Sequence, residues 1–179
     1  MRVITGSAKG KRLESPKGDD VVRPTTDRVK EALFSILQFE LENAAVLDLF
    51  AGSGQLGIEA LSRGAASCFF VEKDPTVAKL VERNVSACNF KESCKVIRGD
   101  FKAVLNGVRQ CFDIAFIDPP YAAGLFDEAL ELTAAHMSNC GIMVCEHPKD
   151  IDVTSPDGFL RKDYKYGRII ISVFRKEVQ

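Results

Sequence analysis

The amino-acid sequence predicts an α/β protein built on a doubly wound, mostly parallel sheet, and three observations support this class. From residue 45 to about residue 148, apolar strand-like runs alternate with amphipathic helical stretches. A glycine-rich turn at residues 51–57 follows the first of these runs directly. Two extended runs near the end, residues 160–166 and 169–174, lie either side of Gly167 with no helix between them, which predicts an antiparallel hairpin. Seven strands are expected in total.

Each element follows from its own pattern. We expect five strands before the closing hairpin, at residues 45–50, 67–71, 95–98, 112–117 and 142–145. Helices are expected between them at residues 56–63, 76–89, 101–105 and 125–136. An earlier helix, which Thr26 or Asp27 can cap, is indicated by apolar residues at helical spacing, namely Val29, Ala32, Leu33, Ile36 and Leu37.

The first residues predict a separate small element. Gly6 and Gly10 flank a bend, so residues 1–15 are expected to form a β-hairpin. We therefore divide the chain into a basic hairpin extension at residues 1–22 and one main domain at residues 23–179. The expected architecture is thus a seven-stranded doubly wound sheet with a C-terminal antiparallel hairpin and a small N-terminal β-hairpin.

Composition excludes several classes of protein. A hydrophobic content of 46% and a charged content of 27% are ordinary for a globular protein, and no apolar run is long enough for a membrane span. No signal-peptide pattern is present, so a cytoplasmic protein is expected. The six cysteines include no C-x-x-C pair, and Cys140, Cys145 and His147 match no usual zinc spacing. Reduced cysteines and no metal site are expected.

Positive charge is concentrated at the beginning of the chain. Residues 1–30 contain eight Lys or Arg and four Asp or Glu, a net charge of +4, which leaves −5 for the rest. This asymmetry favours a nucleic-acid partner, although a solvated basic tail or surface salt bridges would also explain it. The candidate RNA-binding residues are Arg2, Lys9, Lys11, Arg12, Arg23, Thr25 and Arg28.

The glycine-rich turn is a candidate cofactor site. Gly52, Gly54 and Gly57 fit the G-x-G-x-x-G pattern, in which glycines permit a tight turn and let a ligand lie against bare backbone. The alternative is a strand–helix turn that needs small residues for packing only. The pattern also suits a NAD-dependent dehydrogenase, but Asp48, inside the preceding strand, is better placed to approach a cationic amino group than a pyrophosphate.

Three further acids are expected at the carboxyl edge of the sheet. Glu72 follows the second strand and can accept hydrogen bonds from both ribose hydroxyls. Asp100 follows the third and can hold an adenine amino group, with Phe101 beside the ring. Asp118 follows the fourth. Each acid could instead be a helix cap. A ligand with an ammonium group, a ribose and an adenine is S-adenosylmethionine.

Five sequence stretches carry a resemblance to a known family. Residues 48–54, Asp-Leu-Phe-Ala-Gly-Ser-Gly, look like the first motif of class I S-adenosylmethionine-dependent methyltransferases. Residues 118–121, Asp-Pro-Pro-Tyr, look like the (D/N)PPY motif of enzymes that methylate exocyclic amino groups of bases. Residues 23–34 and 56–65, with the glycine-flanked bend at residues 6–13, resemble the RsmD family, which methylates the N2 amino group of a guanine in bacterial 16S ribosomal RNA.

The resemblance implies a Rossmann-like fold, S-adenosylmethionine as cofactor, and 16S rRNA or the assembling small ribosomal subunit as partner. It implies a cofactor site formed by Asp48, Phe50, Gly52, Gly54, Glu72, Asp100, Phe101 and Asp118. It implies a catalytic turn formed by Asp118, Pro119, Pro120 and Tyr121. A monomer without membrane contacts is expected.

The chemistry expected of this turn is the activation of a poorly nucleophilic amino group. Asp118 and the Pro119 carbonyl can accept its two N–H hydrogen bonds, and Tyr121 can stack on the extruded base. Two alternatives stay open. One is an enzyme that methylates adenine N6 or cytosine N4 in DNA or another RNA, and the other is a non-catalytic module that binds S-adenosylmethionine or RNA.

Overall fold

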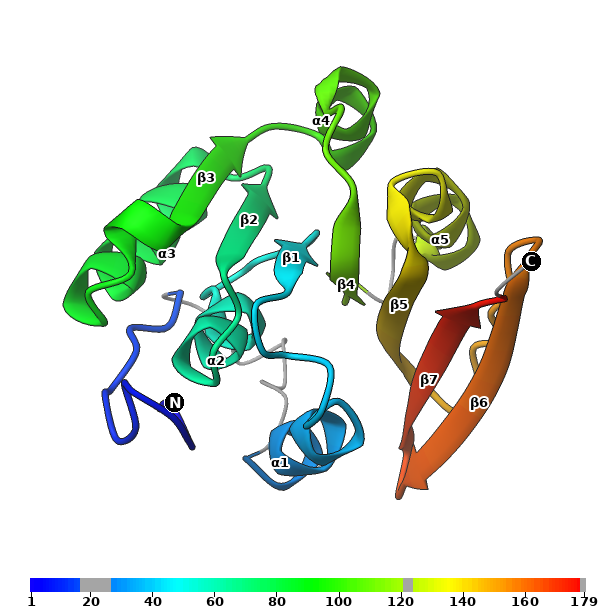
Figure 1. Cartoon of the computed structure of the whole chain (residues 1–179), viewed down its shortest axis with the longest axis horizontal. Helices are drawn as coiled ribbons and strands as arrows, with labels where there is room; N and C mark the ends of the chain where they lie inside the picture. The colour runs from blue at the N-terminus through cyan, green and yellow to red at the C-terminus, as the bar shows by residue number, and fades with distance from the viewer. Residues whose placement is uncertain (17–26, 121–123, 178–179) are drawn as a thin grey trace.

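A seven-stranded sheet with helices on both faces forms the protein (Figure 1). The computed structural model describes residues 1–16, 27–120 and 124–177. The strand order is β3-β2-β1-β4-β5-β7-β6. The first five strands pair in parallel, and β7 pairs antiparallel with both β5 and β6. The expected fold class, including the closing antiparallel hairpin, is confirmed.

The described elements agree with those expected from the sequence, with small shifts at their ends. The strands are β1 (Ala45–Asp48), β2 (Ser67–Glu72), β3 (Cys94–Arg98), β4 (Phe112–Ile117), β5 (Met137–Pro148), β6 (Phe159–Tyr166) and β7 (Ile169–Lys176). The helices are α1 (Asp27–Ile36), α2 (Gln55–Ser62), α3 (Pro75–Ala87), α4 (Phe101–Gly107), α5 (Phe126–Ala134) and the short 3₁₀-helix η1 (Lys91–Ser93).

The strand β5 differs most from expectation. It was expected at residues 142–145, with His147 in the loop that follows, but it runs from Met137 to Pro148 and includes His147. The reason is its antiparallel partner, because β7 pairs with residues 142–148 and so continues the ladder beyond the end of β4. The placement of His147 in a loop was therefore wrong.

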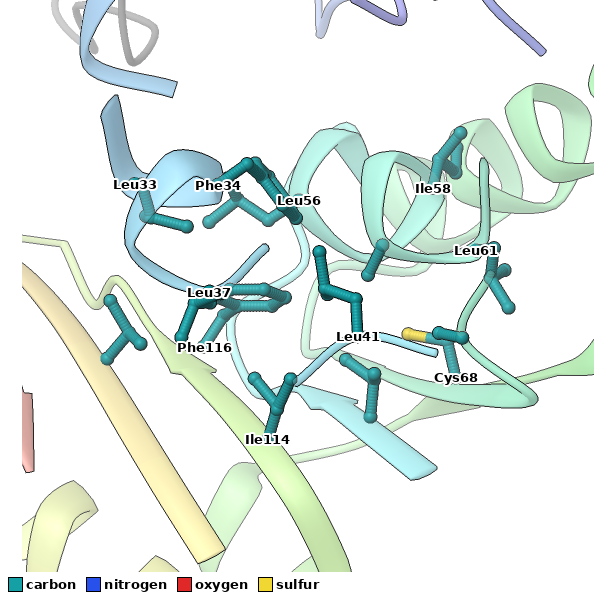
Figure 2. Packing of buried hydrophobic residues seen from close by; sticks show 14 of the residues in the cluster. Leu33, Phe34, Leu37, Leu41, Leu56, Ile58, Leu61, Cys68, Ile114 and Phe116 are labelled. Atoms are coloured by element: carbon teal, nitrogen blue, oxygen red, sulfur yellow. The ribbon is translucent and has the colours of Figure 1, made fainter. Parts of the chain in front are cut away.

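The sheet divides the core into two layers, and helices cover each of them. The helices α1, α2 and α3 lie on one side of the sheet, and α4 and α5 lie on the other (Figure 1). In the first layer, Phe34 of α1 packs against Phe116 of β4, with ring centroids 5.6 Å apart, and Leu33 and Leu37 lie beside it (Figure 2). This packing fixes α1 over the middle of the sheet.

The buried face of α1 is shifted from the one that apolar spacing predicts, although most of the predicted residues are buried. Val29, Leu33 and Leu37 are buried as expected, but Ile36 is only half-buried, and Lys30 is fully buried instead. Lys30 can occupy this position because its ammonium lies 3.6 Å from the equally buried carboxylate of Glu59. An ion pair between α1 and α2 therefore shifts the buried stripe of α1. The apolar periodicity of α1 alone does not reveal this ion pair.

Residues 1–16, here called the N-terminal segment, pack against the first layer. Among them, one antiparallel bridge joins Arg2 to Arg12, where two short paired strands were expected. Val3, Ala8 and Leu13 belong to the same buried cluster as α1 and α2. The rest of the expected extension, residues 17–22, lies outside the described residues.

Two further findings concern the part of the chain that the structure describes. No helix there is long and apolar enough to cross a membrane. Within the same residues, the His, Cys, Asp and Glu side chains form no group of three or more that could hold a metal ion. The six cysteines are free thiols.

Candidate active site

The candidate site lies where the order of strands in the sheet reverses. The chain proceeds from β1 outward to β2 and β3, and then returns to the other side of β1 with β4 and β5. Ligands of open α/β sheets bind at the carboxyl ends of the strands at such a point. The glycine turn (residues 50–54) follows β1, and residues 118–120 follow β4. Leu49 N donates to Phe116 O at 3.0 Å, so these two turns leave the sheet side by side.

Left-handed glycines shape the turn after β1. Gly52 has φ 53° and Gly54 has φ 76°, both in the region that disfavours side chains, and α2 begins at the next residue. Gly57 serves close packing instead, because a Cβ there would lie 2.3 Å from the ring of Phe70 on β2. The pattern therefore makes the turn tight and brings the first turn of α2 against the sheet.

Asp48 supports this turn from beneath. Its Oδ2 accepts a hydrogen bond from Gly57 N at 2.9 Å, and the residue is only 3% exposed. Burial raises the pKa of Asp48 to about 7; the Gly57 hydrogen bond opposes the rise and the nearby Glu72 carboxylate adds to it. A cation bound nearby would favour the ionised form, so this part of the site is suited to a positively charged group.

Glu72 and Asp100 line the same edge over β2 and β3. Glu72 accepts hydrogen bonds from Gly52 N at 3.0 Å and from Asp74 N at 2.9 Å, so it fixes the glycine turn from the other side. Asp100 accepts from Lys102 N at 3.1 Å at the start of α4 and pairs with Lys73 at 3.2 Å. The alternative role of a helix cap is thus observed for Asp100, although both acids retain oxygen lone pairs.

An aromatic pair joins the first residue of the glycine turn to the first residue of α4. The rings of Phe50 and Phe101 are 5.1 Å apart and tilted by 53°. Phe101 is buried, whereas Phe50 is half-buried. The structure therefore brings together two residues that are far apart in sequence and that were both assigned to the cofactor site.

The turn after β4 begins at the edge of the core. Asp118 is half-buried, Pro119 is buried and Pro120 is exposed, while Tyr121 lies outside the described residues. Desolvation raises the pKa of the Asp118 carboxyl well above its ordinary value, and the carboxylates of Glu146 and Asp48 raise it further. Carboxylates at the carboxyl ends of β1 and β5 thus both act on Asp118 at the end of β4.

Sequence reasoning gave no role to Glu146. It is 5% exposed and follows Cys145, which is the register partner of Ile117, so it stands beside Asp118 on the neighbouring strand. The available signal was an acid at the end of the fifth expected strand, in the same position that singled out Glu72, Asp100 and Asp118. Glu146 directly follows the strand expected at residues 142–145, but it lies outside every motif that carries the family resemblance, so this signal was not used.

The basic candidates occupy the N-terminal segment and the first turn of α1. Lys9, Lys11, Arg12 and Arg28 are exposed. Arg2 is also exposed and pairs with Asp27 at 3.3 Å. Arg23 and Thr25 lie outside the described residues. Among the described residues, these exposed basic side chains are therefore accessible to a binding partner. They belong to the N-terminal segment and α1, and not to the turns at the carboxyl edge of the sheet.

Sequence reasoning also missed the residues that attach this segment to the fold. Glu59 of α2, fully buried, accepts hydrogen bonds from Ile4 N at 2.8 Å and Thr5 N at 3.0 Å. Arg63 pairs with the same carboxylate at 2.8 Å, and Lys30 donates to Arg2 O at 2.6 Å. Burial lowers the pKa of Lys30, which the charges of Glu59 and Asp27 counteract in part. Two helices thereby hold the backbone of the segment.

Known proteins resemble this chain over nearly its whole length. The model of the family described as "Conserved hypothetical protein 95" matches residues 1–175. YlbH of Bacillus subtilis strain 168, provisionally named an rRNA methyltransferase, is 34% identical over 183 residues, which cover 98% of this chain and 99% of YlbH. The Escherichia coli K12 protein named ribosomal RNA small subunit methyltransferase D is 37% identical over 132 residues, covering 74% of this chain and 66% of its own.

Solved structures agree with these relatives. The structure of yhhF from Escherichia coli, provisionally named a methyltransferase, superimposes with a TM-score of 0.87 at 31% identity and covers 100% of this chain and 99% of its own. The family model, the relatives and the fold agree with the motifs at the carboxyl edge. This chain belongs to the RsmD family of methyltransferases.

Proposed function

We propose that this protein transfers a methyl group from S-adenosylmethionine to the exocyclic N2 amino group of a guanine in 16S ribosomal RNA. Family membership supports a methyltransferase, and the Escherichia coli relative is named for the small-subunit rRNA. The observation that carries the proposal is geometric. The turn that begins at Asp118 leaves the sheet beside the glycine turn, so a cofactor held by one faces a base held by the other.

The residues of the glycine turn fit S-adenosylmethionine. The buried Asp48 carboxyl suits the ammonium of the methionyl group, and Glu72 suits the ribose hydroxyls. Asp100 and the Phe50–Phe101 pair suit the adenine, one as a hydrogen-bond acceptor and the other as an apolar wall. When bound, this cofactor supplies an electrophilic methyl group on its sulfonium.

The turn at Asp118 activates the acceptor nitrogen. The lone pair of a guanine amino group is delocalised into the ring, so the nitrogen is a poor nucleophile. Asp118 and the Pro119 carbonyl accept its two N–H hydrogen bonds and direct the lone pair outward, while Tyr121 stacks on the base. A nitrogen–carbon bond forms as the carbon–sulfur bond breaks, and the nitrogen then releases one proton. The raised pKa of Asp118 means that the carboxylate needed for this role becomes more abundant as pH rises.

The basic residues hold the RNA in this proposal. Arg2, Lys9, Lys11, Arg12 and Arg28, with Arg23 and Thr25, contact phosphates of the rRNA chain, and none of them takes part in the chemistry. The substrate is 16S rRNA, either free or within the assembling small subunit, and the enzyme acts as a monomer in the cytoplasm.

Substitution of Asp118 tests the catalytic assignment. D118A should reduce methyl transfer to 16S rRNA by roughly 10²-fold or more, because the turn loses its charged acceptor, while S-adenosylhomocysteine affinity changes only a few-fold. Transfer is measured with labelled S-adenosylmethionine, and affinity by calorimetry. The matched control is D157A, which removes an exposed carboxylate before β6 and should retain activity. Turnover of D118A near that of the wild type would contradict the assigned role.

The same assay decides the substrate. Protein-free 16S rRNA, small-subunit particles and DNA are offered in parallel, and the modified nucleoside is identified by mass spectrometry. The expected product is N2-methylguanosine from one of the two rRNA forms. Methylated adenine N6 or cytosine N4, or modification of DNA instead of rRNA, would contradict the proposed substrate and leave the methyltransferase itself in place.

A further inference from the structure

One buried amide contacts both the glycine turn and the N-terminal segment. Asn84 of α3 is 2% exposed. Its Nδ2 donates to Ser53 O at 2.9 Å and to Glu14 O at 3.0 Å, and its Oδ1 accepts from Glu14 N at 2.8 Å. Both amide hydrogens and one oxygen lone pair are therefore used. Asn84 thus joins a residue of the cofactor turn to a residue of the basic segment.

An amide at this position needs a specific explanation. Asn84 occupies the buried stripe of α3 together with Ala78, Val81 and Val85, where an aliphatic side chain would pack without desolvation cost. An aliphatic residue would, however, leave the backbone groups of Glu14 and Ser53 without these partners. The three hydrogen bonds offset the cost of burying the amide, and they specify how the segment meets the turn.

Two more contacts strengthen the connection at Ser53 and its neighbour. Ser53 Oγ donates to Met1 Sδ at 3.0 Å, and Met1 O accepts from Leu13 N at 3.1 Å. A Cβ on Gly54 would lie 3.0 Å from Val81, one helical turn before Asn84. The glycine turn therefore rests directly on α3. Met1 contacts Ser53, the residue between the two left-handed glycines of the turn, and Glu14 is joined to Ser53 through Asn84.

We propose that Asn84 is a positioning residue that couples cofactor binding at the glycine turn to RNA binding by the N-terminal segment. This proposal rests on the function proposed above. A cofactor that fixes the backbone of Ser53 also fixes Asn84 and, through it, Glu14. Lys11 and Arg12 lie within three residues of Glu14, so their orientation toward RNA phosphates is fixed at the same time. By linkage, bound RNA strengthens cofactor binding by the same factor.

The coupling factor is the measurement that separates this role from a merely structural one. The rRNA affinity is measured by fluorescence anisotropy without and with saturating S-adenosylhomocysteine, using 16S rRNA or small-subunit particles, whichever the transfer assay identifies. We expect the wild type to bind rRNA roughly 5-fold or more tightly with the cofactor product present. In N84A the ratio of the rRNA affinity with S-adenosylhomocysteine to the rRNA affinity without it should fall to near one. The affinity of N84A for S-adenosylhomocysteine should likewise no longer depend on rRNA.

A matched variant, S62A, weakens the attachment of the N-terminal segment to α2 and leaves the contacts of the glycine turn unchanged. Ser62 of α2 accepts from Ala8 N at 3.0 Å and donates to Thr5 O at 2.6 Å. S62A should weaken rRNA binding equally with and without S-adenosylhomocysteine, so that its ratio stays at the wild-type value. If N84A does not fold, as judged by circular dichroism, N84S is measured in its place, since its hydroxyl cannot span both partners.

The outcomes distinguish the two proposals. A wild-type ratio in N84A or N84S, or a ratio of one in the wild type when both ligands bind, would overturn the coupling role of Asn84. A loss of the ratio in S62A as large as that in N84A would also overturn it, because any loosening of the segment would then suffice. A wild type that binds neither S-adenosylhomocysteine nor rRNA would overturn the proposed function itself.

Discussion

The two ends of the chain are attached to the central sheet by different means. At the C-terminal end, β6 and β7 form a continuous antiparallel ladder that pairs with β5 over residues 142–148. At the N-terminal end, the described residues 1–16 contain one bridge, and side chains of α2 and α3 hold the backbone instead. A ladder repeats the same bond along its length, whereas each side-chain anchor is a single point.

This difference predicts which attachment is more sensitive to single substitutions. Because the hairpin has many equivalent ladder hydrogen bonds, the loss of one leaves its neighbours in place. The N-terminal segment depends on a few buried polar groups, each of which is costly when its partner is removed. The segment with the basic residues is thus the part of the molecule in which single substitutions have the largest expected effects.

The largest effect is expected from breaking the buried charge cluster of α1 and α2. E59A leaves Lys30 buried without its carboxylate and frees the backbone of Ile4 and Thr5, at a cost of about 3–5 kcal/mol of unfolding free energy. D163A is the matched change in the C-terminal hairpin, where the carboxylate is partly exposed, and should cost only about 1–2 kcal/mol. Urea unfolding measures both. Equal losses would contradict the difference between the two attachments.

The dependence of stability on pH should also differ between the glycine turn, which Asp48 supports, and the C-terminal hairpin, which contains Asp163. The raised pKa of Asp48, about 7 against an unfolded value of about 3.9, means that the folded state holds the proton more tightly, so its contribution to stability falls as pH rises through this interval. Desolvation alone would raise the pKa of Asp163, but hydrogen bonds from Arg161 and Ser172 outweigh it and lower the pKa. Its contribution is present above its unfolded pKa and is lost as pH falls through its folded one.

Two asparagine variants make these opposite signs visible. D48N should gain stability relative to the wild type between pH 4 and pH 8, by on the order of 2–4 kcal/mol at the alkaline end. D163N should be less stable than the wild type at pH 6, and this difference should shrink toward pH 3. Thermal unfolding across this pH range measures both trends. Parallel trends in the two variants would contradict the opposite environments.

A smaller effect is expected when charge alone is changed. Reversal of Lys9, Lys11 and Arg12 to Glu should weaken rRNA binding about tenfold at moderate salt, and it should flatten the dependence of affinity on salt concentration. K162E/K165E on β6 is the control, because both side chains are exposed on the hairpin at the far edge of the sheet. A salt slope unchanged by the N-terminal reversal would show that the segment does not contact phosphates.

The sequence predicted what depends on local pattern and little of what depends on distant partners. The strands and the glycine turn follow from apolar runs and from residues such as Gly52 and Gly54, whose conformations are set locally. Glu59 and Asn84 escaped notice because each lies in a helix and bonds backbone groups more than 50 residues away, so no periodicity marks it. Glu146 escaped notice because, although it directly follows the strand expected at residues 142–145, none of the motifs that carry the resemblance contains it.

A row of hydrogen-bonded polar side chains across β5, β7 and β6 has a consequence for how these strands are aligned. His147 Nε2 lies 2.8 Å from Ser172 Oγ, which donates to Asp163 Oδ1 at 2.7 Å. These residues come from β5, β7 and β6, and His147 is fully buried. A slip of β7 against β5 by one residue would turn Ser172 to the opposite face and leave the buried imidazole of His147 without this partner. This row of polar side chains thereby excludes misaligned pairings that apolar residues alone, with three consecutive isoleucines at 169–171, would tolerate.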